Sequence, residues 1–266
     1  MRRILIVVSF AFCSAIFAQS GTYNTPFEQN NQATATYAEA IDFYKKLDAG
    51  YLQMQLIEAG PTDSGHPLHL AVVSKSGEFD PAKLREQGKL ILLINNGIHP
   101  GEPEGVDASM VLCRDLLQKP DYQKMLEHVV VAIIPMYNID GSLNRGCCSR
   151  ANQDGPQEYG FRGNARNLDL NRDFIKCDTR NARSFVQLFN RWQPDVFVDN
   201  HTSNGADYQY TMTMLPTQTD KLGTVLGSYM RRILLPRLYT RMAERRQEMC
   251  PYVNEFKDTP ADGIYA

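Results

Sequence analysis

Apolar and polar positions follow each other in blocks along most of the chain, and these blocks predict strands and helices in turn. Short apolar runs predict strands of a sheet that is covered on both faces, because such strands need no polar side. Runs with an apolar residue every three to four positions predict helices with one buried face. The expected strands are 51–57, 68–73, 89–94, 129–135, 195–199 and 208–214, and the expected helices are 37–47, 103–117, 185–192 and 217–249.

The order of these elements predicts an α/β fold with a central, mostly parallel or mixed sheet and helices on both faces. We expect one domain over residues 37–266, because no internal repeat or linker interrupts it. The last helix is expected to kink near Pro236, since a proline inside a helix removes a hydrogen bond. Residues 138–170 have little periodicity, and loops of this length are usually functional.

The N-terminal residues 1–18 are typical of a signal peptide. A positively charged start precedes an apolar segment, residues 4–17, that is short for a membrane span, and Ala18 suits a cleavage site. We therefore expect export to the periplasm or the medium, with residues 19–36 forming an extended polar leader of the mature protein.

Composition limits the classes of partner. The 266 residues are 43% hydrophobic and carry a formal net charge of -2, which gives no support for binding to nucleic acid. No membrane span is expected in the mature chain. Six cysteines do not make a dense disulfide framework, and the adjacent Cys147 and Cys148 lack a second pair nearby for a tetrahedral metal site.

Polar side chains follow two of the expected strands where each strand ends. His99 and Glu102 come shortly after strand 89–94, and His201 comes directly after strand 195–199. Open α/β sheets place their chemistry at the carboxyl ends of strands. Imidazole and carboxylate groups are good zinc ligands, and a catalytic site uses three of them and leaves one position for water. The sequence therefore predicts one zinc ion at this edge.

Two segments between these residues carry amides and cations. An arginine flanked by amide and acid groups, in Asp169-Leu170-Asn171-Arg172, suits bidentate capture of a carboxylate, and a salt-bridged surface turn is the alternative. The turn Asn138-Ile139-Asp140-Gly141 follows strand 129–135. Cations beside a metal site favour an anionic substrate or a developing oxyanion. Those that follow the turn are Arg145, Arg150, Arg162 and Arg166.

Four elements follow one another along the chain: His99 with Glu102, the Asn138 turn, the segment 169–172, and His201. With these elements in this order, the chain resembles the zinc metallocarboxypeptidases typified by carboxypeptidase A, over about residues 37–215. The resemblance implies a peptide substrate with a free C-terminal carboxylate and a single zinc ion. It assigns the zinc ligands and the two residues that hold the terminal carboxylate, which here are His99, Glu102, His201, Asn171 and Arg172.

The resemblance also implies an arginine that polarises the scissile carbonyl. Arg150 matches it best, because Arg150-Ala151-Asn152 repeats the Arg-x-Asn pattern of the family, and Arg145 is the alternative. The family's general base, a glutamate on a late strand, has no convincing match. The candidates are Glu244, Glu248 and Glu255. We also expect that the 266 residues are the N-terminal portion of a longer enzyme that supplies this base.

The predicted function is that of an exported zinc-dependent hydrolase that releases C-terminal residues from peptides. Two alternatives stay open. The first is a zinc-containing protein that binds the C-termini of peptides or peptidoglycan without cleaving them, because it has no general base. The second is a zinc deacylase of N-acyl amino acids, since relatives with that activity share the metal ligands.

Overall fold

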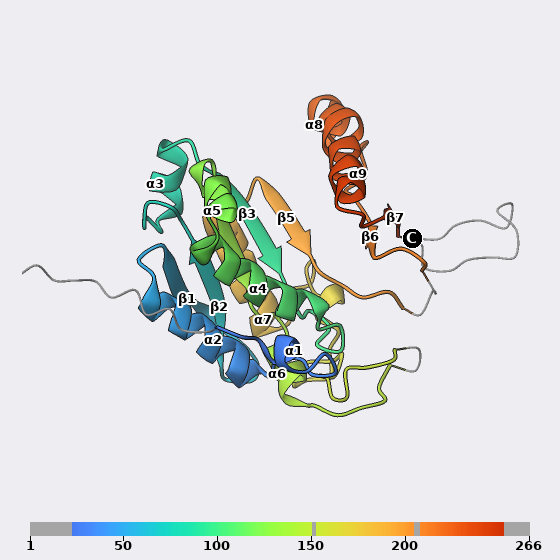
Figure 1. Ribbon diagram of the computed structural model, residues 1–266. Helices are drawn as coiled ribbons and strands as arrows, with labels where there is room; N and C mark the ends of the chain where they lie inside the picture. Colours follow the sequence, from blue (N-terminus) through green and yellow to red (C-terminus); the bar gives the residue numbers. More distant parts are fainter. Residues whose placement is uncertain (1–22, 151–152, 205–207, 253–266) are drawn as a thin grey trace, which may run out of the picture. The chain divides into compact units, whose positions relative to one another are not determined.

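The computed structural model describes residues 23–150, 153–204 and 208–252, so the predicted signal peptide lies outside the described residues (Figure 1). The chain forms two compact units, which are described separately. Unit one consists of Met1–Gly146 and Pro156–His201, and unit two of Cys147–Gly155 and Thr202–Ala266.

Unit one contains a mixed five-stranded sheet with the strand order β1-β2-β4-β3-β5. β1 pairs antiparallel with β2, and β2 pairs antiparallel with β4, whereas β4, β3 and β5 run parallel. This sheet confirms the predicted fold class. Its strands are β1 (Met54–Pro61), β2 (Pro67–Val73), β3 (Leu90–Asn95), β4 (Val129–Ile134) and β5 (Val196–Asp199).

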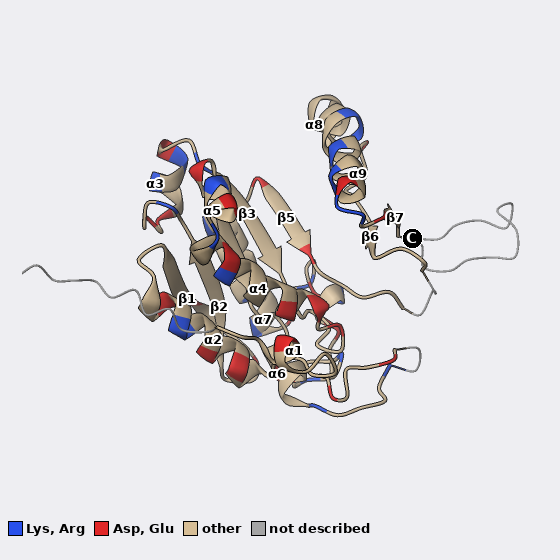
Figure 2. Cartoon of the chain, viewed as in Figure 1, with Lys and Arg blue, Asp and Glu red and all other residues tan. Residues whose placement is uncertain are grey.

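Helices cover both faces of this sheet (Figure 1). On one face lie α2 (Tyr37–Gly50) and α4 (Glu104–Gln118), and on the other lie α3 (Pro81–Glu86) and α7 (Arg180–Trp192). The three central strands β2, β3 and β4 contain no Asp, Glu, Lys or Arg, and the charged residues lie mainly on helices and loops (Figure 2). Two apolar layers, one on each side of the sheet, therefore form the core.

Several element boundaries differ from the prediction, and two of them lie at helix caps. β1 starts at Met54 rather than at residue 51, since Tyr51 is the C-cap of α2. α7 starts at Arg180 rather than at residue 185, because the Thr179 side chain accepts a hydrogen bond from the amide of Ala182 and caps the helix.

Residues 23–36, expected to be extended, include the one-turn helix α1, which the side chains of Thr25 and Glu28 cap. The loop-rich segment 138–170 includes α6, which begins directly after the predicted Asn138 turn. The remaining short elements of unit one are α1 (Pro26–Gln29), α5 (Pro120–Gln123), η1 (Lys124–Glu127), α6 (Ile139–Leu143) and η2 (Leu170–Arg172).

Unit two contains a parallel strand pair, β6 and β7, and three consecutive helical segments in place of the single kinked helix. The irregularity is a π-helical turn that ends two residues before Pro236, which fits a proline that cannot complete the hydrogen-bond ladder. Cys147 and Cys148 form a disulfide. The elements are β6 (Met212–Met214), α8 (Gly223–Tyr229), η3 (Met230–Leu234), α9 (Leu235–Glu244) and β7 (Met249–Pro251).

Among the described residues, no helix combines the length and the apolarity that crossing a membrane requires.

The first turn of α4 lies very close to the end of β5. A Cβ atom added to Gly105 would lie 2.4 Å from the Cβ atom of Asn200 and 2.8 Å from Oδ1 of Asn96. The same two asparagines are joined by a hydrogen bond of 2.8 Å, from Nδ2 of Asn200 to Oδ1 of Asn96. Only glycine therefore permits this approach of helix and strand.

We predict that Gly105→Ala lowers the free energy of unfolding by about 1–3 kcal/mol, because the added methyl group overpacks a rigid contact. Helix propensity alone predicts the opposite sign, since alanine is favoured over glycine within helices by about 1 kcal/mol. Urea unfolding followed by circular dichroism measures the change. Gly146→Ala is the control, because an added Cβ there meets no atom within 4 Å. Stabilisation by Gly105→Ala would contradict the prediction.

Candidate metal centre

The parallel register of β3 and β5 brings the predicted ligands to one edge of the sheet. Asn95, the last residue of β3, lies opposite Asp199, the last residue of β5. The amide of Asn200 then donates to the carbonyl of Asn95 at 3.0 Å, which keeps the two segments together beyond the ends of the strands. His99 follows four residues after the end of one strand, and His201 follows two residues after the end of the other.

His99, Glu102 and His201 form a cluster in which one ligand atom of each lies within 4.8 Å of the others. The Glu102 carboxylate lies between the two imidazoles: Oε1 is 3.1 Å from Nδ1 of His99, and Oε2 is 2.9 Å from Nδ1 of His201. His99 and Glu102 are each only 3% exposed, whereas the His201 side chain is 33% exposed. Two nitrogen donors and a carboxylate, accessible from one side, fit an open zinc site.

Each imidazole also contacts a further carboxylate through its Nε2 atom. Nε2 of His99 lies 3.0 Å from Oδ1 of Asp169, and Nε2 of His201 lies 3.1 Å from Oδ2 of Asp199. Asp199 is itself fixed, because its Oδ1 accepts a hydrogen bond from Nδ2 of Asn95 at 2.8 Å. Such carboxylate–histidine pairs set the tautomer and the ring orientation of metal-binding histidines. In both rings the Nδ1 atom is therefore the one directed at the cluster.

The carboxylates shift the protonation equilibria of this site. Burial lowers the pKa of His201, but hydrogen bonds and charge attraction from Asp199 and Glu102 outweigh it and raise the pKa to about 9. Burial raises the pKa of Asp169, but its hydrogen bonds with His99 and the Asn171 amide, and the charges of His99 and Arg162, bring the pKa below its usual value. The site thus favours a charged Asp169.

The turn that starts at Asn138 joins the two loops of the site. Its side-chain Nδ2 donates to the carbonyl of Ile98 at 3.4 Å and to the carbonyl of Arg162 at 2.9 Å, while its Oδ1 accepts from the amide of Gly141. Asn138 is fully buried. The conspicuous Asn-x-Asp-Gly turn therefore fixes the backbone next to His99 relative to that of Arg162.

The structure places Arg162, one of the cations that follow the Asn138 turn, next to the cluster. Nη1 of Arg162 lies 3.4 Å from Nδ1 of His99 and 3.9 Å from Oε1 of Glu102. Its Nε and Nη2 atoms lie 3.0 and 2.9 Å from Oδ2 of Asp169. Arg162 is followed by Gly163 and Asn164, so it has the same Arg-x-Asn pattern that favoured Arg150. This repeated pattern is the signal that could have found it.

Arg150 and Arg145, the two sequence candidates for the catalytic arginine, make the following contacts. Arg150 belongs to unit two, where its Nε donates to the Gln153 side chain and its Nη2 to the carbonyl of Ser203. The guanidinium of Arg145 donates to main-chain carbonyls of unit one.

Asn171 and Arg172 lie in the 3-10 helix η2, which is joined to the cluster through its cap residue Asp169. Oδ1 of Asp169 accepts the amide of Asn171 at 2.9 Å and is the same atom that contacts His99. Arg172 is exposed, and its Nη1 donates to the carbonyl of Asn171. One carboxylate therefore connects His99 to the predicted carboxylate-binding segment.

The three glutamates considered as bases, Glu244, Glu248 and Glu255, belong to unit two. Glu244 of unit two makes an exposed ion pair with Arg241 at 2.8 Å, and Glu255 lies outside the described residues.

Comparison with known proteins agrees with this architecture. The sequence profile of the zinc carboxypeptidase family matches residues 41–261. Carboxypeptidase 2 of Trichophyton rubrum is 26% identical over 193 residues, which cover 71% of this chain and 32% of that protein. Carboxypeptidase 2 of Trichophyton tonsurans is 31% identical over 114 residues, which cover 42% of this chain and 18% of that protein. The matches thus span a third or less of these relatives' lengths.

Solved structures share the fold at low sequence identity. A metallo-carboxypeptidase from Burkholderia cenocepacia has a TM-score of 0.58 and 19% identity, over 82% of this chain and 54% of that chain. One from Pseudomonas aeruginosa, in complex with (2-guanidinoethylmercapto)succinic acid, has a TM-score of 0.58 and 16% identity, over 86% of this chain and 54% of that chain. Since the family profile matches most of the sequence, the chain belongs to the zinc carboxypeptidase family.

Proposed function

We propose that the protein is a zinc-dependent carboxypeptidase that removes C-terminal residues from peptides. The observation that carries this proposal is the buried Glu102 carboxylate between two imidazoles, with Arg162 beside it. Family membership supports a metallopeptidase, and the donor set of the cluster supports zinc as the metal.

His99, Glu102 and His201 would hold the zinc ion. When bound, zinc would supply Lewis-acid polarisation of the scissile carbonyl and activation of a water molecule. Asp169 and Asp199 keep the two imidazoles oriented so that each presents Nδ1.

Arg162 would stabilise the oxyanion that develops on the scissile carbonyl. A guanidinium keeps its charge at any working pH, and its planar donors suit a developing anion. Asp169 pairs with two of its nitrogens, which directs Nη1 toward the cluster. In the proposal Arg162 takes the role that the sequence pattern gave to Arg150.

Asn171 and Arg172 would bind the C-terminal carboxylate of the substrate. Arg172 is exposed, and an arginine can form two parallel hydrogen bonds with a carboxylate. Since η2 is capped by Asp169, the distance between this carboxylate site and His99 is fixed by the fold. A fixed distance selects the last peptide bond, which is the basis of exopeptidase action.

The purified protein is expected to hold one zinc ion per chain, and His99→Ala and His201→Ala are each expected to lose it, because two ligands no longer suffice. Metal content after dialysis, measured by inductively coupled plasma mass spectrometry, tests this. His128→Ala is the matched control, since His128 is an exposed histidine outside the cluster. A wild-type protein without zinc, or zinc retained in His99→Ala, would falsify the metal assignment.

Arg172→Ala should raise KM for a blocked dipeptide with a free C-terminal carboxylate by about 10- to 100-fold, the effect of losing a charge-assisted hydrogen bond of about 1.5–3 kcal/mol. The amidated dipeptide should bind equally weakly to both proteins. Arg183→Ala, which removes another exposed arginine that donates to a main-chain carbonyl, is the control. Binding of the free carboxylate without turnover would instead favour the non-catalytic binder.

Arg162→Gln should lower kcat by about 10²- to 10³-fold, the usual cost of removing an oxyanion donor, with the zinc content unchanged. Arg150→Gln should lower kcat much less. Steady-state kinetics of the two variants on one dipeptide decide between these arginines. If Arg150→Gln is the more damaging substitution, the assignment of Arg162 is wrong.

A further inference from the structure

We infer that the N-terminal strap, defined here as residues 34–35, positions the zinc ligands through Asp107 and Arg145. The inference rests on the proposed function, and it assigns to Asp107 and Arg145 a role as positioning residues rather than catalytic ones. Within the described residues, the hydrogen bonds of Asp107 and Arg145 go to the strap and to Glu158, and none of them goes to a residue of the cluster.

The strap is bound on one side by a buried carboxylate. Oδ2 of Asp107 accepts the Thr34 hydroxyl at 2.5 Å, and Oδ1 accepts the amide of Ala35 at 3.1 Å. Thr34, Ala35 and Asp107 are 5%, 1% and 7% exposed. A carboxylate buried to this extent requires such partners. Asp107 lies in the first turn of α4, five residues after Glu102.

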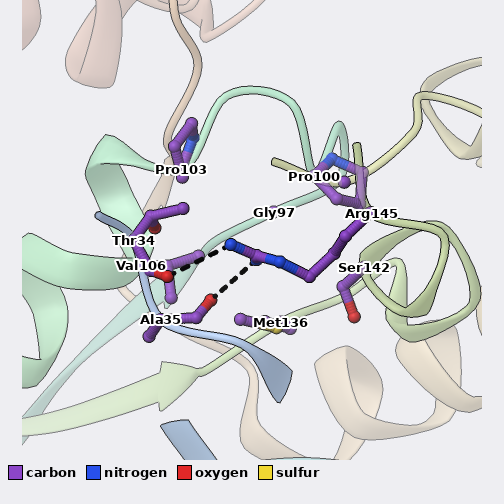
Figure 3. A pocket seen from close by; sticks show the side chains of 10 residues that line it. Thr34, Ala35, Gly97, Pro100, Pro103, Val106, Met136, Ser142 and Arg145 are labelled. Carbon is purple, nitrogen blue, oxygen red and sulfur yellow. Dashed lines mark hydrogen bonds between the residues drawn. The ribbon is translucent and has the colours of Figure 1, made fainter. Parts of the chain in front are cut away.

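On the other side the strap is bound by a guanidinium (Figure 3). Nη1 of Arg145 donates to the carbonyl of Ala35 and Nη2 to the carbonyl of Thr34, both at 3.3 Å. Nη2 also donates to the carbonyl of Glu158 at 2.9 Å. Arg145 therefore ties the strap to the segment that leads to Arg162. The five donors of an arginine permit this, because several carbonyls can be satisfied at once.

The strap and the 158–160 segment both reach the loop that carries His99 and Glu102. Gly160 donates to the carbonyl of Pro100 at 3.2 Å, and a Cβ on Gly160 would lie 2.4 Å from the Cβ of Pro100. Pro100 and Pro103 also line a small cavity together with the strap and Arg145 (Figure 3). The ligand loop is thus enclosed by segments that Arg145 and Asp107 hold in place.

Metal sites need their ligands held within about 0.5 Å of the productive geometry, so loosening this enclosure should weaken zinc binding. A purely structural role would lower stability and leave the affinity of the folded protein unchanged. Arg85→Gln provides the matched control, because Arg85 also donates to main-chain carbonyls, those of Trp192 and Gln193, in another part of unit one.

The test compares full-length Arg145→Gln, Asp107→Asn, the double variant and Arg85→Gln. Asp107→Asn keeps one acceptor oxygen, so the chain should still fold. Zinc affinity is measured by competition with a chelator, and unfolding by urea. We expect each single variant to bind zinc about 10- to 100-fold more weakly, as for other groups that support metal ligands. Arg85→Gln should lose stability and keep its zinc affinity.

The double variant should bind zinc about as weakly as the worse single variant, because both residues act through the same strap. Wild-type zinc affinity in both single variants would overturn the inference, as would additive losses in the double variant, because these would mean that the strap does not mediate the effect.

If the wild-type protein binds no zinc, the proposed function fails, and hydrogen exchange still decides this inference. The amides to follow are those of Glu102, which donates to the carbonyl of His99, and Gly160, which donates to that of Pro100. Faster exchange at both amides in Arg145→Gln and Asp107→Asn, but not in Arg85→Gln, would support the positioning role. Unchanged exchange would overturn it.

Discussion

The Glu102 carboxylate, buried and shared between His99 and His201, is the contact on which the rest of the site depends. A carboxylate at 3% exposure is costly unless cations or hydrogen-bond donors surround it. The two imidazoles can reach it only because β3 and β5 run parallel and end level with each other, at Asn95 and Asp199. The sheet register therefore sets the geometry of this cluster.

Asp169 extends this dependence to the substrate side. Its two oxygens contact Nε2 of His99, the guanidinium of Arg162 and the amide of Asn171. Because one carboxylate carries all three contacts, the proposed metal ligand, oxyanion donor and carboxylate-binding turn cannot move independently. A site on a rigid scaffold gains precision in this way.

The arginines show where a sequence pattern becomes ambiguous. Arg-x-Asn occurs at Arg150 and at Arg162, but only Arg150 was matched to it from the sequence. The structure places Arg162 beside the cluster because Asn138 binds its carbonyl and Asp169 binds its side chain. Arg145 has the same charge, but its guanidinium donates to the carbonyls of the strap and of Glu158.

By itself, the sequence determined the α/β class, the core strands and helices, and the three residues of the cluster, because apolar periodicity and ligand chemistry are local properties. It missed the first turns of α7 and the folded strap, since caps and buried hydrogen bonds carry no apolar signal. Only the tertiary structure decided which carboxylates orient the imidazoles and placed Arg162 beside the cluster. Those choices depend on contacts between residues far apart in the chain, such as that between His99 and Asp169.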